Sequence, residues 1–250
     1  MSTPAPVHSR ATSARNGLRG VLLGLIGLAG ATTAAVAGPS FDCNSPRTRS
    51  ERLICASQDL SDLDRRISNA YRNASGALDA PGKSALRVDQ HLFLESRDIQ
   101  AQTDDYDMKA DFEWRAKLLE NIQPDARSGF TGLWANAYGE IRITPVRGGV
   151  FEVDIATVQP YPSFPVCQLK TSGSPQGTIL VVGNATAAER DANDGWTVRL
   201  IRNGTALTAE LQRPPSSGMS SPPFCGFRTS IDGDYLPVHR MPADPRFKAE

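Results

Sequence analysis

The chain has 250 residues and equal numbers of basic and acidic side chains, 27 of each, so its formal net charge is zero. A chain with this balance presents no strongly basic field, which excludes nucleic acid as an expected partner. Its length is enough for one large domain or two small domains behind a leader.

Residues 1–37 have the pattern of a secretory signal peptide. Three arginines precede a short apolar run, Val21–Ile26, and no acidic residue occurs before the small residues that end at Ala37. The run is too short for a stable membrane span, which needs about 20 apolar residues. No cysteine stands at the expected cleavage site to accept a lipid anchor. We therefore expect Sec-type export, cleavage after Ala37, and a periplasmic or secreted product with a net charge of about −3.

Residues 38–124 are expected to form a domain of three or four helices. Apolar side chains recur there at steps of three and four, which is the spacing of one helix face. A segment rich in Gly, Pro and Asp, 76–82, should form the turn of an antiparallel hairpin between the first two helices, and Pro124 should follow the last helix. The apolar positions are Leu60, Leu63, Ile67, Ala70, Tyr71, Ala74 and Leu78 in the first helix, Leu86, Phe93 and Leu94 in the second, and Met108, Phe112, Leu118 and Leu119 in the third.

Residues 129–240 show the alternation of short strands, and residues 241–250 should form a tail. Gly148-Gly149 and Asn203-Gly204 lie between alternating runs and suit tight hairpin turns, whereas the proline-rich segments 160–165 and 214–218 should be loops. The alternating positions are Ile141 and Ile143; Phe151, Val153 and Ile155; Ile179 and Val181; Trp196, Val198 and Leu200; and Leu207, Ala209 and Leu211. The sequence thus predicts an α+β protein in which a helical hairpin or bundle precedes an antiparallel meander of seven or eight strands, closed as a barrel or packed as a sandwich.

All four cysteines follow the leader, and an even number in an exported chain predicts two disulfides. Two cysteines fall in each half of the chain. This division favours one bridge within the helical half, Cys43 with Cys55, and one within the β half, Cys167 with Cys225.

A series of short motifs follows the leader. It consists of Phe41-Asp42-Cys43, Glu51 to Cys55, Leu63-Asp64, Tyr71, Leu86 with Gln90, and Arg97-Asp98. The order and spacing of these motifs over residues 40–100 resemble the N-terminal domain of the LprI-type lysozyme inhibitors, a family of bacterial envelope proteins. Phe93 stands where that family usually carries tryptophan, and Gln100 stands where many members carry another cysteine. The resemblance implies a lysozyme as partner and steric inhibition, and the missing cysteine supports the bridge between Cys43 and Cys55.

Five polar residues of the helical half form a candidate cluster: Asp64, Tyr71, Gln90, Arg97 and Asp98. They could recognise a partner. The favoured interpretation is structural, with an Asp–Arg ion pair between facing helices and with Tyr and Gln hydrogen-bonded at its margin.

We expect no catalytic, cofactor-binding or metal-binding residue. Only two histidines follow the leader, His91 and His239, and they lie in different halves. No Gly-x-Ser-x-Gly elbow occurs, and cysteines in disulfides supply no thiolate nucleophile. Four aromatic residues lie near the boundary of the halves: Trp114, Phe130, Trp134 and Tyr138. A role in core packing is favoured for them over binding of a sugar or a protein.

The sequence therefore predicts a protein that binds and does not catalyse. The first hypothesis is a lysozyme inhibitor, whose small negative charge would weakly attract a basic lysozyme. The alternative is an envelope stress or interaction module in which the helices are a scaffold and the β half binds an unknown ligand. A third is a hydrolase with paired carboxylates, since such pairs are recognised by their separation in space. The sequence makes no prediction about the oligomeric state.

Overall fold

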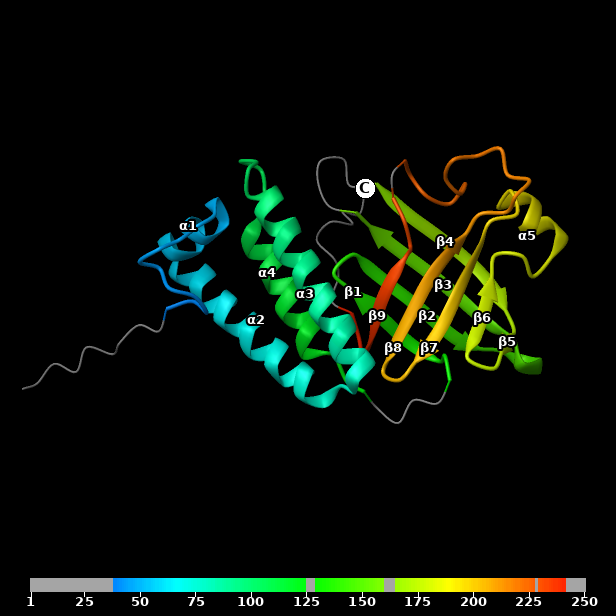
Figure 1. Ribbon diagram of the computed structural model, residues 1–250, viewed down its shortest axis with the longest axis horizontal. Helices are drawn as coiled ribbons and strands as arrows, with labels where there is room; N and C mark the ends of the chain where they lie inside the picture. Colours follow the sequence, from blue (N-terminus) through cyan, green and yellow to red (C-terminus); the bar gives the residue numbers. More distant parts are fainter. Residues whose placement is uncertain (1–37, 125–128, 160–164, 228, 242–250) are drawn as a thin grey trace, which may run out of the picture. The chain divides into compact units, whose positions relative to one another are not determined.

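The computed structural model describes residues 38–124, 129–159, 165–227 and 229–241 (Figure 1). The described residues belong to one compact unit. The expected signal peptide, the 160–164 part of the first proline-rich loop and residues 242–250 of the tail lie outside the described residues, and the predicted domain boundaries stay predictions.

Four helices form the first part of the described chain, as predicted. They are α1 (Arg49–Ala56), α2 (Gln58–Ala77), α3 (Ala80–Gln100) and α4 (Met108–Glu120). Each begins after a side chain that accepts a hydrogen bond from the first turn, namely Thr48, Ser57, Asp79 and Asp107. Such caps satisfy amide groups that have no partner within the helix.

The predicted turn over residues 76–82 is too long. Gly76 lies inside α2, and Pro81 and Gly82 lie in the first turn of α3, so only Leu78 and Asp79 separate the two helices. Proline is tolerated in a first helical turn because its missing N–H would have no partner there. The composition of this segment therefore marks the start of a helix and not a loop.

The helices pack in a different order from the predicted hairpin. Contacts between α2 and α3 are few, whereas α2 packs extensively along α4. At the surface Arg66 of α2 binds Glu120 of α4 through two hydrogen bonds of 2.6 Å each. Phe93 of α3 meets Phe112 of α4 with ring centroids 5.9 Å apart, so long side chains join these two helices.

Nine antiparallel strands follow, in the spatial order β4-β3-β2-β1-β9-β8-β7-β6-β5. Hence two meanders, β1–β4 and β5–β9, are joined where the last strand pairs with the first. The other ends approach each other, because β4 contacts β6 and the sheet forms a nearly closed barrel. The strands are β1 (Gly132–Asn136), β2 (Gly139–Pro145), β3 (Phe151–Val158), β4 (Val166–Gly173), β5 (Pro175–Gln176), β6 (Ile179–Val182), β7 (Thr197–Asn203), β8 (Ala206–Gln212) and β9 (Gly233–Val238).

The α+β class and the antiparallel barrel are confirmed, but one strand was predicted in the wrong phase. In β6 the side chains of Leu180 and Val182 are buried in the barrel, while Val181 is 37% exposed. All four residues of β6 are aliphatic, so alternation alone could not identify the buried face. The short elements between the strands are the 3-10 turn Arg147–Gly149 and the helix α5 (Ala187–Ala192).

The barrel interior forms one of two hydrophobic cores. Trp134 and Tyr235 are its largest buried aromatic side chains. The indole N–H of Trp134 donates to the carbonyl of Phe130 at 2.8 Å, and the guanidinium of Arg202 lies 4.5 Å from the centre of the indole ring. Cys167 belongs to this core and forms the predicted disulfide with Cys225.

The second core lies between the helices and the outer face of the sheet. Figure 1 shows α3 and α4 beside β1 and β9. The strands contribute Leu133, Ala135, Ala206, Leu236 and Val238, and the helices contribute Phe93, Phe112, Trp114 and Leu118 among others. The helices therefore cover strand residues that would otherwise expose apolar surface to water.

Main-chain contacts join the same parts. Ile122, just after α4, forms an isolated bridge with Val238 of β9, and the amide of Gln123 donates to the carbonyl of Pro237 at 3.0 Å. Among the described residues, no helix is long and apolar enough to span a membrane.

Candidate functional site

The first candidate site lies where α1 meets the far end of α3, and it is built on a disulfide. Cys43 is bonded to Cys55, with their Cα atoms 5.6 Å apart. The bridge joins the segment before α1 to the last turn of α1. This short helix could gain little stability alone, so the disulfide fixes it against the rest of the module. The predicted pairing is confirmed.

The N-terminus of α1 carries a capping box. The Thr48 side chain accepts from the amide of Glu51 at 3.2 Å, and the Glu51 carboxylate accepts from the amide of Thr48 at 3.3 Å. The Glu51 carboxylate also accepts from the amide of Arg47. The motif glutamate therefore orders the entry into α1.

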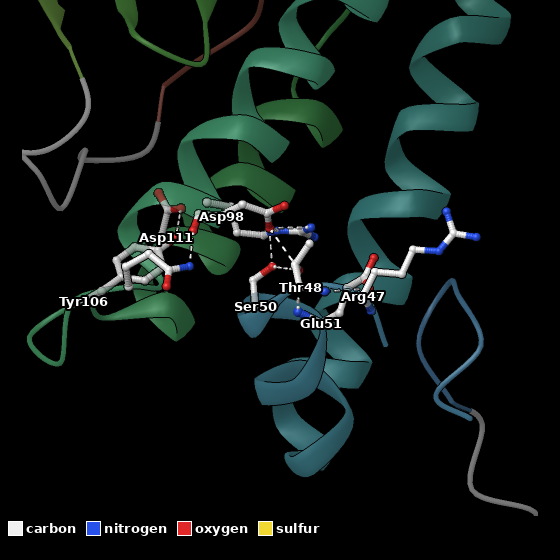
Figure 2. A network of polar contacts seen from close by, with 9 residues as sticks. Arg47, Thr48, Ser50, Glu51, Asp98, Tyr106 and Asp111 are labelled. Atoms are coloured by element: carbon white, nitrogen blue, oxygen red, sulfur yellow. Dashed lines mark hydrogen bonds and ion pairs between the residues drawn. The ribbon is translucent and has the colours of Figure 1, made fainter. Parts of the chain in front are cut away.

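Asp98 connects this helix start to α3. Its carboxylate accepts from Ser50, which is fully buried, and from the hydroxyl of Thr48 at 3.5 Å. It also forms an ion pair with its neighbour Arg97 at 3.0 Å. Figure 2 shows the Asp98 carboxylate directed at Thr48 and Ser50, with the Glu51 side chain on the same helix start. The motif residue Asp98 at the end of α3 therefore binds the start of α1 through Thr48 and Ser50, which lie just before the Glu51 motif.

Figure 2 also shows a second polar pair near this end of the helices. The Tyr106 hydroxyl donates to the Asp111 carboxylate at 2.5 Å, across the start of α4. Asp107 caps α4 by accepting from the amide of Ala110 at 3.0 Å. The connection from α3 to α4 is therefore ordered by acidic side chains.

Asp64 and its neighbour Arg65 hold the segment that precedes α1. The Asp64 carboxylate accepts from the amide of Ser40 at 2.7 Å, and Arg65 donates to the carbonyl of Gly38 at 3.0 Å. Phe41 packs on the helix–sheet core, as does Tyr71. Asp64 and Asp98, together with the disulfide, thus hold residues 38–56 against α2 and α3.

The five predicted cluster residues do not share one site. Asp64 binds the N-terminal segment, Arg97 and Asp98 lie at the α1 junction, and Gln90 accepts from Arg115 at 2.8 Å. Tyr71 lies half-buried on α2. A role for these residues in recognition stays a prediction.

An ion pair between α3 and α4 escaped the sequence analysis. Arg115 and Asp89 are almost fully buried, and their charged atoms lie 2.7 Å apart. Asp89 also accepts from the amide of Ala137, between β1 and β2, at 2.5 Å, and the Arg115 guanidinium lies 5.0 Å from the centre of the Phe93 ring. The available signal was a cation on the apolar face of α4, between Phe112 and Leu118.

The two histidines of the described chain lie in different parts of the fold. His91 is exposed on α3 and His239 is exposed just after β9. Within the ranges that the structure describes, no three His, Cys, Asp or Glu side chains gather in a group that could hold a metal ion. Of the four boundary aromatics, Trp114, Phe130 and Trp134 are buried and Tyr138 is half-buried against the helix–sheet core.

Comparison with known proteins agrees with the motif series. Residues 43–131 match the family model described as lysozyme inhibitor LprI, which confirms the predicted resemblance. Similar proteins include those named Lipoprotein LprI from Mycobacterium bovis and from two strains of Mycobacterium tuberculosis, each 38% identical over 74 residues. These matches cover 30% of this chain and 36% of each relative. No solved structure gave a significant match.

The matched region coincides with one part of the fold. It begins at the first disulfide cysteine, includes α1 to α4 and ends just before β1, which starts at Gly132. The barrel, which is the larger part of the described chain, lies outside it.

Proposed function

We propose that this protein is an exported lysozyme inhibitor that acts by binding, with the four-helix segment as its recognition module. The observation that carries the proposal is the match of residues 43–131 to the lysozyme inhibitor LprI model. The motif residues inside this match support it, because they are engaged in the contacts that hold α1 in place. Export is supported by two disulfides, which persist in oxidising compartments.

We assign lysozyme contact to the outer surface of α1 and the end of α3. Leu53 of α1 is 40% exposed and Ile99 of α3 is 46% exposed, while the polar groups between these helices bind each other. Apolar surface rimmed by polar residues marks protein-binding sites, and we take Leu53 and Ile99 as the apolar part of this one. Such a surface placed over the glycan cleft of a lysozyme would block substrate entry sterically.

The test is inhibition of c-, g- and i-type lysozymes by the oxidised protein without residues 1–37. We expect inhibition of at least one class that is competitive with cell-wall substrate. Combining Leu53→Ala with Ile99→Ala should weaken inhibition at least tenfold, equivalent to about 1.4 kcal/mol, with no change in the melting temperature.

The matched control is Val181→Ala on β6, which alters an exposed aliphatic side chain outside the family match. It should inhibit like the parent protein. Absence of inhibition of every lysozyme class by folded protein would refute the proposal, and equal inhibition by all variants would refute the assigned surface.

A second candidate is an envelope interaction module whose barrel binds the ligand. The observation that favours it is an open hollow of about 660 Å³ over the outer face of β2–β4 and α5. Arg142, Asp154 and Lys170 occupy directly opposed positions on its three strands. If this candidate is correct, replacing Arg142 and Lys170 with alanine abolishes capture of an envelope partner, and the parent protein inhibits no lysozyme.

A further inference from the structure

The barrel carries a separate hollow beneath the connection between β8 and β9. Its volume is about 270 Å³, and its described lining consists of Trp196, Leu211, Ser220, Ser221, Pro222, Phe227 and Thr229. This volume is slightly below the roughly 300–1,000 Å³ of most small-molecule sites. The hollow can therefore receive one ring, or one unit of a longer chain.

The lining combines aromatic or aliphatic surface with hydroxyl groups. Phe227 is 72% exposed, the highest value among the large hydrophobic side chains that the structure describes as exposed. Three of the lining residues bear hydroxyls, and those of Ser220 and Ser221 make no hydrogen bond with another described residue. None of the described lining residues carries a charge.

The connection that forms this hollow is fastened at both ends. Near its start, Ser217 accepts from the indole N–H of Trp196 at 3.0 Å and donates to Asp194. Near its end, Cys225 is bonded to Cys167 of β4, and the amide of Gly226 donates to the carbonyl of Val166 at 2.8 Å. The hollow is therefore preformed, which reduces the entropy that a ligand must overcome.

We propose that this hollow is a binding site for a neutral pyranose ring of a polysaccharide. A pyranose has one face of C–H groups and a rim of hydroxyls, so it matches an exposed aromatic ring beside free serine hydroxyls. The C–H face lies on Phe227, and ring hydroxyls bond Ser220 and Ser221.

The test is calorimetric titration of the oxidised protein with N-acetylglucosamine oligomers and, separately, with maltose oligomers. We expect binding of at least one series with a Kd of about 1 mM for the single ring contacted. Amide NMR shifts should be confined to residues 219–229 and to the strand ends beside them. Phe227→Ala should weaken binding at least tenfold, and Ser220→Ala with Ser221→Ala about fivefold.

Val88→Ala is the matched control, because it removes an exposed apolar side chain from α3 outside both assigned surfaces and should leave saccharide binding unchanged. Absence of binding by both series, or equal binding by Phe227→Ala, overturns the inference. Lysozyme inhibition is measured on the same variants. Loss of inhibition in Phe227→Ala without any saccharide binding would place the lysozyme contact at this hollow. That result overturns the saccharide site and the contact surface assigned to α1 and α3, while lysozyme inhibition itself stands.

Discussion

The carboxylate of Asp79 binds both donors of Thr205, the hydroxyl at 2.6 Å and the amide at 2.9 Å. Asp79 also caps α3 by accepting from the amide of Gly82 at 3.0 Å. One side chain thus starts a helix and holds the β7–β8 hairpin against it. Gly204 fits this contact with a positive φ of 53°, since a Cβ there would lie 2.1 Å from the Asp79 carboxylate.

Replacement of Asp79 or Thr205 should therefore destabilise the helix–barrel contact. We expect Asp79→Ala to lower the free energy of unfolding by about 1–2 kcal/mol, because it removes a cap as well as the bonds to Thr205. Thr205→Ala should cost about 1 kcal/mol. Urea unfolding of the two single variants and the double variant measures their coupling, and Asp105→Asn, at an exposed acid, serves as the control. Strict additivity would contradict the contact.

The stability that the Asp79–Thr205 contact contributes should depend on pH. Partial burial opposes the charge, but hydrogen bonds from Thr205 and Gly82 and the positive charge of Arg202 together lower the pKa of Asp79. A carboxylate with a lowered folded-state pKa contributes stability above its unfolded pKa, near 4, and loses it as the pH falls through the folded value. The stability difference between the parent protein and Asp79→Asn should shrink between pH 5 and pH 2. Because the site is exposed, the change should stay below about 1 kcal/mol, and a pH-independent difference would contradict it.

Replacing one partner of the buried pair Asp89–Arg115 should destabilise the protein more than replacing Asp79. Asp89→Ala or Arg115→Ala leaves a buried charge without its partner, so each should lower the free energy of unfolding by about 3–5 kcal/mol. Asp89→Leu combined with Arg115→Met removes both charges and should cost much less than the sum of the single changes. Arg142→Ala, at a surface pair with Glu140, is the control and should change stability by less than about 0.5 kcal/mol. If the double variant loses as much unfolding free energy as the two single variants added together, the ion pair is not the cause of their destabilisation.

Removal of the first disulfide should act locally. Cys43 and Cys55 are 12 positions apart, and the loop-entropy model gives about 3 kcal/mol for a loop of this size. We expect the double serine variant to show fast amide exchange in α1 while the barrel amides stay protected. Lysozyme inhibition should fall with it if α1 supplies the contact. The equivalent change at Cys167 and Cys225 tests specificity, because its amide exchange should instead increase near the β8–β9 connection.

The elements that the sequence predicted best are those with a strict period. Ile141 and Ile143, or Leu207 and Ala209, alternate with polar residues, and these pairs lie inside the barrel. The helical spacing from Leu60 to Leu78 likewise identified α2, of which Ile67, Ala70 and Ala74 enter the core. Hydrophobic periodicity is local information, and here the local pattern agrees with the tertiary burial.

The parts that escaped prediction depend on partners distant in the chain. Leu133 and Ala135 of β1 are buried on one side by helices, while Trp134 between them is buried by the barrel. A strand covered on both faces has no alternation to detect. The burial of Arg115 could not be predicted either, because its partners Asp89 and Gln90 lie on another helix, α3.

The helix–sheet core has a consequence for how this chain can be divided. The helices matched by the family model have apolar faces that are completed by Leu236 and Val238, near the other end of the chain. A fragment that ends before β1 would expose these apolar faces to water. It would then aggregate or bind another apolar surface. A relative that carries the same helices without this barrel must supply its own cover for them, by a different domain, a lipid surface or self-association. The helical segment can therefore be transferred to another protein only together with a surface that covers its apolar faces.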